Sequence, residues 1–173
     1  MNTEIIDVSK LSLLDDDKLE SIVADFSSKH DFNPRKERIS RLADQLGIRC
    51  YIGEKSAPGP TLIFKDMGNV WASVTPDMSI VAINAHLSLA IAYHALKENG
   101  ALSPITDVIL TGGNTPPELT FALRRFVAML VMPKEAFLIT KRNLGREARV
   151  GTLAIAFGTT KELVSLRLKQ LKL

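Results

Sequence analysis

The chain has 173 residues, of which 46% are hydrophobic and 24% charged, and it contains a single cysteine, Cys50. This length suits one domain with its own buried core, the apolar fraction excludes a disordered chain, and the lone cysteine excludes a disulfide scaffold. The cysteine usage and an N-terminal segment without the apolar core of a signal peptide predict a cytoplasmic protein. The most apolar stretch, residues 80–96, contains two histidines, an asparagine and a serine. We therefore expect a buried helix there and no membrane partner.

The net charge of +3 is distributed unevenly along the chain. Residues 1–33 contain eight acidic and three basic side chains, a net charge of −5, and residues 124–173 contain eleven basic and three acidic ones, a net charge of +8. A basic C-terminal third predicts contact with nucleic acid or with an acidic partner. The alternative interpretation is that the two ends neutralise each other within the folded molecule.

The first half of the chain predicts two helices followed by a small sheet. Asp15 begins a helix with an apolar stripe, Asn33 and Pro34 suggest the start of a second helix, and Gly47 ends it. Three β-prone runs then follow, at residues 48–52, 61–64 and 70–75. Because no glycine-rich phosphate loop or βαβ pattern is present, we expect a three-stranded antiparallel meander.

The second half predicts helices. Residues 79–99 form a long helix that is apolar nearly all round, so we expect it in the middle of the domain. A connection over residues 101–117 leads to helices at residues 119–131 and 134–141. The end of the chain predicts two short helices around Gly158, with a capping box at residues 159–162, which is the outline of a helix-turn-helix.

Three local motifs in this order resemble the ImmA/IrrE family of zincin-like metallopeptidases, which are often paired with helix-turn-helix repressors. The family's A-H-E-L-G-H helix corresponds to AHLSLAIAYH at residues 85–94, and its F-A-A-x-L-L-M-P helix end corresponds to FVAMLVMP at residues 126–133. Its tail, L-A-x-x-F-x-V-S followed by R-L-x-x-L, corresponds to LAIAFGTT at residues 153–160 and RLKQL at residues 167–171. The resemblance covers about residues 15–173. It implies an α+β, zincin-like domain.

The metal chemistry of that family is not carried by these residues. A zincin binds zinc with two histidines one helical turn apart, and the glutamate after the first histidine is the general base. His86 matches the first ligand, but Leu87 stands in place of the glutamate and Ala90 in place of the second histidine. The family's acidic third ligand falls in a region that contains Arg124 and Arg125. We therefore predict no catalytic residues, no metal and no cofactor.

The remaining reactive residues offer no better-supported chemistry. His94 lies eight residues after His86, about 12 Å along a helix, too far to share one ion. Asp107 and Glu118 could complete a displaced zinc site from the long connection. Cys50 is expected to be a buried thiol. The aromatic residues of the predicted sheet are expected to pack against helices, with a base-stacking platform as the alternative.

The sequence thus predicts a single ImmA/IrrE-like domain over residues 1–173, with a zincin-like core at 1–145 and a helix-turn-helix-like pair at 146–173. The resemblance implies a catalytically inactive regulator that binds a phage or mobile-element repressor stoichiometrically, as an antirepressor or co-regulator. An edge strand could bind an extended partner segment. Two alternatives remain: direct DNA binding by the basic C-terminal helices, and residual zinc peptidase activity. The expected partner-binding residues are His86, His94, Arg124 and Arg125. The candidate nucleic-acid contacts are Arg146, Arg149, Lys161 and Arg167.

Overall fold

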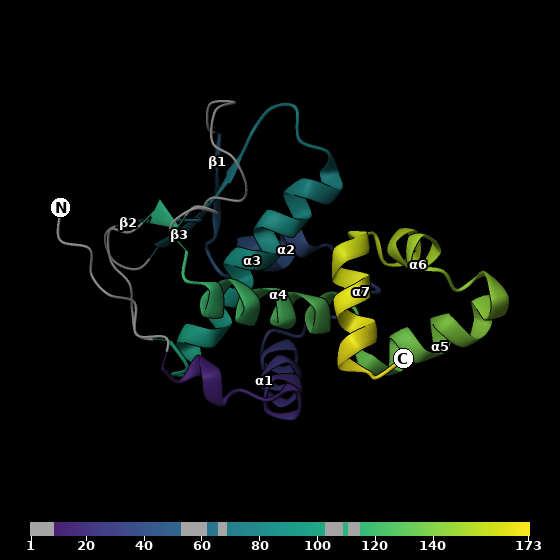
Figure 1. The fold of residues 1–173 in the computed structure, drawn as a ribbon. Coiled ribbons are helices and arrows are strands. Elements are labelled where there is room, and N and C mark those ends of the chain that lie inside the picture. Colours follow the sequence, from purple (N-terminus) through teal and green to yellow (C-terminus); the bar gives the residue numbers. More distant parts are fainter. Residues whose placement is uncertain (1–8, 53–61, 66–68, 103–108, 111–114) are drawn as a thin grey trace.

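The computed structural model describes residues 9–52, 62–65, 69–102, 109–110 and 115–173. Most residues in these ranges are helical, and four short strands form one sheet (Figure 1). The α-helices are α1 (Asp16–Lys29), α2 (Ile39–Gln45), α3 (Ile80–Glu98), α4 (Pro117–Val131), α5 (Lys134–Leu144), α6 (Val150–Phe157) and α7 (Lys161–Gln170). The strands are β1 (Arg49–Ile52), β2 (Leu62–Lys65), β3 (Asn69–Val74) and β4 (Ile109–Leu110). Two short 3-10 turns are η1 (Leu11–Leu13) and η3 (Gly145–Glu147).

The predicted α+β, zincin-like fold with a three-stranded antiparallel sheet is wrong. The protein is mostly helical, and its small sheet has the order β1-β3-β2-β4, with β1 parallel to β3 and β2 antiparallel to both neighbours. Only three residues separate β2 from β3, so this pair must be antiparallel. β1 instead pairs with a strand that is not its neighbour in sequence, so no local turn determines its direction. β4 arises from the connection that was expected to be loop.

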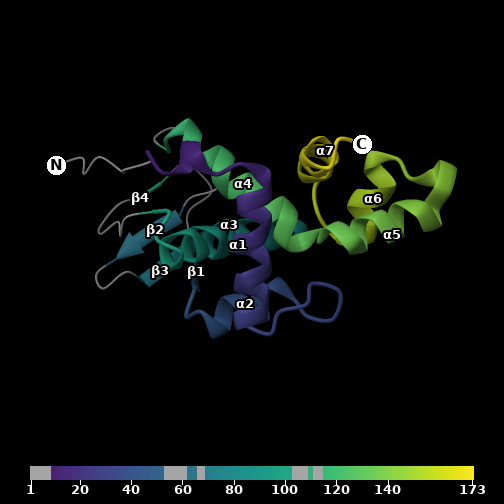
Figure 2. The same cartoon turned by 90° about the horizontal axis from the view of Figure 1, so that it is seen from below.

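Helix α3 lies at the centre of the core, where it packs against α1, α2, α4, β2 and β3 (Figures 1 and 2). The Ser79 hydroxyl caps it by accepting a hydrogen bond from the Ala82 N–H at 3.2 Å. Of the described helices, α3 alone is long and apolar enough to cross a membrane. Here it is a core helix, as the sequence predicts, with Leu87, Ala90 and Ile91 buried.

The C-terminal third leaves the core and then returns to it. Helices α5 and α6, joined by η3, project from one end of the molecule, and α7 packs back against α4 (Figures 1 and 2). We call residues 134–157 the arm. Its two helices are held together by Phe137 and Phe157, whose rings stack with centroids 5.6 Å apart. The arm therefore presents more of its surface to solvent than α3 or α4 does.

Helix boundaries follow local capping chemistry, with two corrections to the sequence prediction. Asp15 caps α1 as expected, and Gly158 ends α6 in the left-handed conformation at φ 58°. Asn33 does not begin a helix: its carbonyl closes an isolated turn, and α2 starts at Ile39. The cap of α7 is Thr160, one residue later than the predicted capping box requires, because its hydroxyl accepts from the Leu163 N–H.

Candidate functional site

A groove runs between α3 and the turn from α6 to α7, with α4 as its floor. It consists of two adjoining cavities of about 420 and 280 Å³ that share Ala85, Val127 and Leu163. The larger cavity extends toward the segment before α2, where Glu37 and Arg38 line it. We call these two cavities together the groove. A concave opening of this size, lined by apolar side chains and a few polar groups, is typical of a ligand-binding site.

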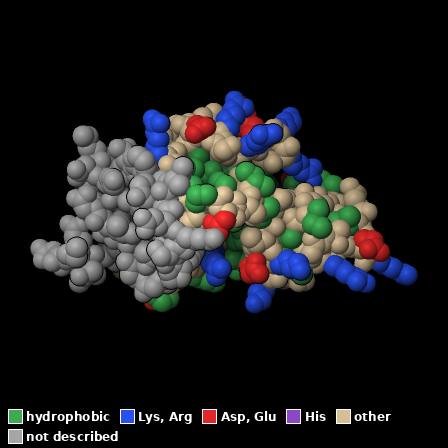
Figure 3. All heavy atoms as spheres, turned by 90° about the horizontal axis from the view of Figure 1, so that it is seen from above, with side chains coloured by type: hydrophobic (Ala, Val, Ile, Leu, Met, Phe, Trp, Pro, Cys, Tyr) green, Lys and Arg blue, Asp and Glu red, His purple; other side chains and the backbone are tan. Residues whose placement is uncertain are grey.

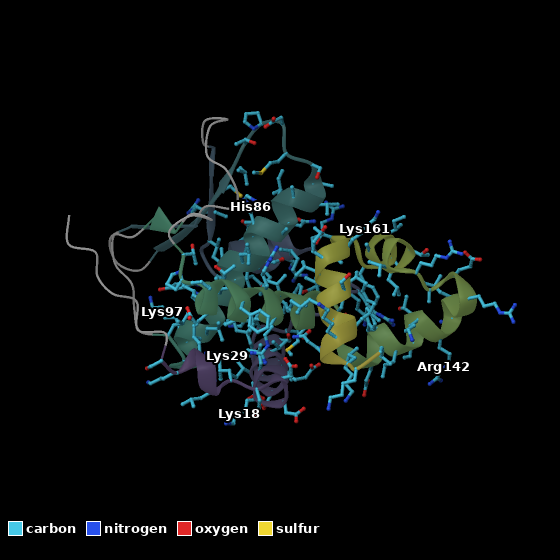
Figure 4. All side chains as sticks on the ribbon, viewed as in Figure 1. Lys18, Lys29, His86, Lys97, Arg142 and Lys161 are labelled. Atoms are coloured by element: carbon cyan, nitrogen blue, oxygen red, sulfur yellow. The ribbon has the colours of Figure 1, made fainter. Side chains whose placement is uncertain are left out.

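Charged and polar groups gather at the smaller end of the groove. His86 on α3, Arg124 on α4, and Thr160 and Glu162 at the start of α7 line this cavity. Glu162 accepts hydrogen bonds from its own N–H and from the Thr160 hydroxyl, and these lower its carboxyl pKa. The nearby positive charges of Arg124 and Lys161 lower that pKa further. Figure 4 shows His86 on α3 and Lys161 at the start of α7, both in the upper half of that view.

Two of the predicted partner-binding residues, His86 and Arg124, are therefore brought into one cavity from helices that are distant in sequence. Thr160 and Glu162 also line this cavity, although neither was among the predicted partner-binding residues. Their capping pattern identified the start of a helix, but only the packing of α7 against α4 places that helix end beside α3. The groove is thus formed by tertiary packing, and the local sequence gives little indication of it.

Of the positions that a zincin uses, His86 lines the groove, but those of the general base and of the second zinc-binding histidine belong to the core. Leu87 and Ala90 are buried at 3% and 0% exposure, as predicted. Ser88 is also buried, and its hydroxyl donates to the Asn84 carbonyl at 2.7 Å. Among the residues that the structure describes, no three His, Cys, Asp or Glu side chains lie close enough to hold a metal ion. The described groove therefore offers a binding surface and no metal-ligand set.

His94 lies outside the groove, farther along α3 and close to α1. It is half-buried, and this burial lowers its pKa, while the nearby Glu98 acts in the opposite direction. Glu98 pairs instead with Lys29, and its Oε2 is 3.5 Å from His30 Nε2. The structure does not bring His94 together with His86 and Arg124, so it does not belong to a common site with them.

Arg125 and Arg167 are structural side chains, and this corrects the expectation that they meet a partner or nucleic acid. Arg125 is 8% exposed and binds the Asp16 carboxylate through Nε and Nη2, at 3.0 and 2.7 Å, and the Leu14 carbonyl at 2.8 Å. Arg167 is fully buried and donates to both carboxylate oxygens of Glu20 and to the Met132 carbonyl. Their donors are directed into the protein.

The remaining candidate nucleic-acid contacts are exposed. Arg146 lies in η3, Arg149 immediately precedes α6, and Lys161 is the first residue of α7. The Lys161 side chain passes close to Gly151, because a Cβ on that glycine would lie 3.7 Å from Lys161 Cε. Arg149 and Lys161 therefore lie near the start of α6, whereas Arg146 lies in the turn between the two helices of the arm.

The other candidate residues contribute nothing to the described groove. Cys50 is exposed, contrary to prediction, because it lies on the edge strand β1; partial burial and the nearby Asp44 nonetheless raise its thiol pKa. Glu118 is exposed on the first turn of α4. Asp107 and the side chains of the predicted aromatic platform lie outside the described residues.

Comparison with family models, with curated proteins and with solved structures gives no match to this chain. The resemblance to the ImmA/IrrE family therefore depends on the quoted motifs alone.

Proposed function

We propose that this protein is a non-catalytic, cytoplasmic regulator that binds a DNA-binding repressor stoichiometrically through the groove. The observation that carries the proposal is the convergence of His86, Arg124 and Glu162 in one open cavity, beside a core in which Leu87 and Ala90 replace the residues of zinc chemistry. Such a site can recognise a protein segment but has no described group that would cleave it.

The identity of the partner comes from the motif resemblance. Members of the ImmA/IrrE family, which these motifs resemble, are often paired with helix-turn-helix repressors of phages and mobile elements. A regulator without catalytic activity can still control such a repressor as an antirepressor or co-regulator, if its binding to the repressor competes with binding of the repressor to the operator. Binding energy alone is sufficient for this, because a ligand that prefers one state of the repressor shifts the population toward that state.

The test begins with the reading frames beside this gene: a helix-turn-helix repressor encoded there is produced together with its operator duplex. Increasing amounts of the protein are added to the preformed repressor–operator complex, and the complex is followed by gel mobility. We expect the complex to shift or dissolve near equal stoichiometry while the repressor remains full length on a denaturing gel. Disappearance of intact repressor at catalytic amounts of this protein would contradict the proposal, and so would an unaffected complex at excess.

A further inference from the structure

Only part of the positive charge in the C-terminal third is neutralised by acidic side chains within the folded molecule. Arg125 and Arg167 are neutralised by Asp16 and Glu20. Residues 134–173 contain nine basic and three acidic side chains, so with Arg167 paired to Glu20 they keep a net charge of +5. In the described part of the chain, no hydrogen bond or ion pair engages the side chains of Arg142, Arg146 or Arg149. This charge is directed to solvent.

Four of these side chains form a basic edge, defined as Arg142, Arg146, Arg149 and Lys161. Arg142 is in the last turn of α5, Arg146 is in η3, which packs on α5, and Arg149 precedes α6. Lys161 joins them from α7 through its approach to Gly151. Figure 4 shows Arg142 directed away from the body of the protein, and in Figure 3 Lys and Arg side chains line the outer margin of this end of the molecule.

The backbone adds to the positive potential at the same place. Helix α6 begins at Val150, and no side chain caps its N-terminus. The first N–H groups of a helix without such a cap can bind an anion, and the helix dipole supports this. These amides lie next to Arg149, so a phosphate near that residue would meet both a guanidinium and backbone donors.

We propose that the basic edge binds the phosphate backbone of duplex DNA without reading its base sequence. The four basic side chains come from separate elements and spread over an exposed surface, and none of them lines the groove. A polymer with regularly repeated phosphates can satisfy such dispersed charges, and arginine binds phosphate with paired hydrogen bonds.

The packing of α7 explains why base sequence is not expected to be read. In a helix-turn-helix, the second helix enters the major groove of DNA. Here α7 packs against α4, and Leu163, Val164 and Arg167 are buried. Of the exposed α7 residues, which are Lys161, Glu162 and Lys169, only Lys161 belongs to the basic edge. Phosphate contacts therefore position the protein on DNA without specifying a site. This inference is independent of the proposed partner in the groove.

The test measures binding to a fluorescent mixed-sequence duplex of about 20 base pairs by anisotropy, between about 50 and about 200 mM salt. Four phosphate contacts predict a loss of affinity on the order of 100-fold over that range, because each contact releases counterions. The triple variant Arg142→Gln, Arg146→Gln, Arg149→Gln should bind at least about tenfold more weakly at the lower salt and show a smaller salt slope. A duplex of unrelated sequence should bind equally well.

The matched control is the triple variant Lys18→Gln, Lys36→Gln, Arg49→Gln, whose residues are all exposed and lie outside the arm. It removes the same net charge, so it should bind the duplex within about twofold of the unchanged protein, because long-range effects of exposed charges are screened. Equal weakening of both variants, or no binding by the unchanged protein at low salt, would overturn the proposal. The proposal would also be overturned if poly-glutamate bound as tightly as the duplex and lost this affinity in the triple arginine variant. That result would identify the basic edge as a site for acidic proteins.

Discussion

The guanidinium of Arg167 forms two hydrogen bonds with the carboxylate of Glu20, at 2.8 and 2.7 Å, although the residues are 147 positions apart. Arg125 and Asp16 form a second pair between the same regions of the chain. The acidic N-terminal helix is thus bound to the basic helices α4 and α7. The alternative interpretation of the uneven charge, mutual neutralisation within the molecule, is confirmed for these two arginines.

The Glu20–Arg167 pair should contribute more stability than the Asp16–Arg125 pair. Arg167 is fully buried, so Glu20→Gln leaves an uncompensated buried charge, and we expect the free energy of unfolding to fall by about 3 kcal/mol. Asp16→Asn should lower it by about 1 kcal/mol, because Arg125 is slightly exposed and keeps its bond to the Leu14 carbonyl. Urea unfolding measures both values. The control Asp25→Asn, exposed on the same helix, should change stability by less than about 0.5 kcal/mol.

Restoring the acidic residue of a peptidase motif should damage the fold. Leu87 is 3% exposed, so Leu87→Glu places a carboxyl group in the apolar core, and we expect a loss of about 3 kcal/mol or more without any proteolytic activity. Leu89→Glu, at a half-buried position on the same helix that lines the groove, should be less damaging. A melting temperature unchanged by Leu87→Glu would show that position 87 is solvated and that this face of α3 does not belong to the core.

The stability of the protein should fall as the pH drops below about 6.5, the ordinary pKa of histidine. Burial lowers the pKa of His94 in the folded protein, so the unfolded chain binds the proton more readily in this range. The negative charge of Glu98 opposes this effect. The positive charges of Lys97, of Lys29 at the end of α1 and of His30, which follows that helix, lower the His94 pKa further. His94→Gln should reduce the pH slope in urea unfolding between pH 5 and 6.5. A steeper slope in that variant would contradict this assignment.

Glu98 should act in a separate, more acidic range. The hydrogen bond from Lys29 is the main cause that lowers the Glu98 pKa below its ordinary value of 4.5, and His30 contributes in the same direction. The resulting stability is present above about pH 4.5 and is lost as the pH falls through the lowered pKa. Glu98→Gln should remove the dependence of the free energy of unfolding on pH in this acidic range. Measuring that free energy against pH for both Glu98→Gln and His94→Gln separates the effects of the two groups. Identical profiles for the two variants would refute the separation.

Protein purified without a chelator should contain far less than one zinc ion per chain. His86 supplies a single ligand, whereas a structural zinc requires four and a catalytic zinc three from the protein. Elemental analysis of the unchanged protein and of His86→Ala measures this directly. Stoichiometric zinc that disappears in the His86→Ala variant would revive the peptidase interpretation.

Local chemistry made several elements predictable. The Asp15 cap, the apolar run around Ile91 and the left-handed Gly158 act over a few residues, so the sequence indicated α1, α3 and the end of α6. The sheet was predicted wrongly for two reasons. β1 pairs with β3 although β2 lies between them in the sequence, and the two-residue β4 is too short to show an alternating pattern.

The candidate site was only partly predictable for the same reason. His86 and Arg124 were predicted from their positions in the motif resemblance, but whether an arginine faces the groove or an internal carboxylate depends on tertiary packing. Arg124 and Arg125 are adjacent in sequence, yet one is exposed at the groove and the other binds Asp16. Position on the helix surface, and not residue type, separates these two roles.

The most direct test of the proposed function is a calorimetric titration of a helix-turn-helix repressor encoded beside this gene with the unchanged protein, with Arg124→Glu and with Lys18→Glu. Arg124 lines the groove, whereas Lys18 is exposed on α1, far from His86 (Figure 4), and both variants reverse one charge. We expect one-to-one binding that Arg124→Glu weakens at least about tenfold and that Lys18→Glu leaves nearly unchanged. Equal affinity of both variants, or cleavage of the repressor during the titration, would contradict stoichiometric binding through the groove.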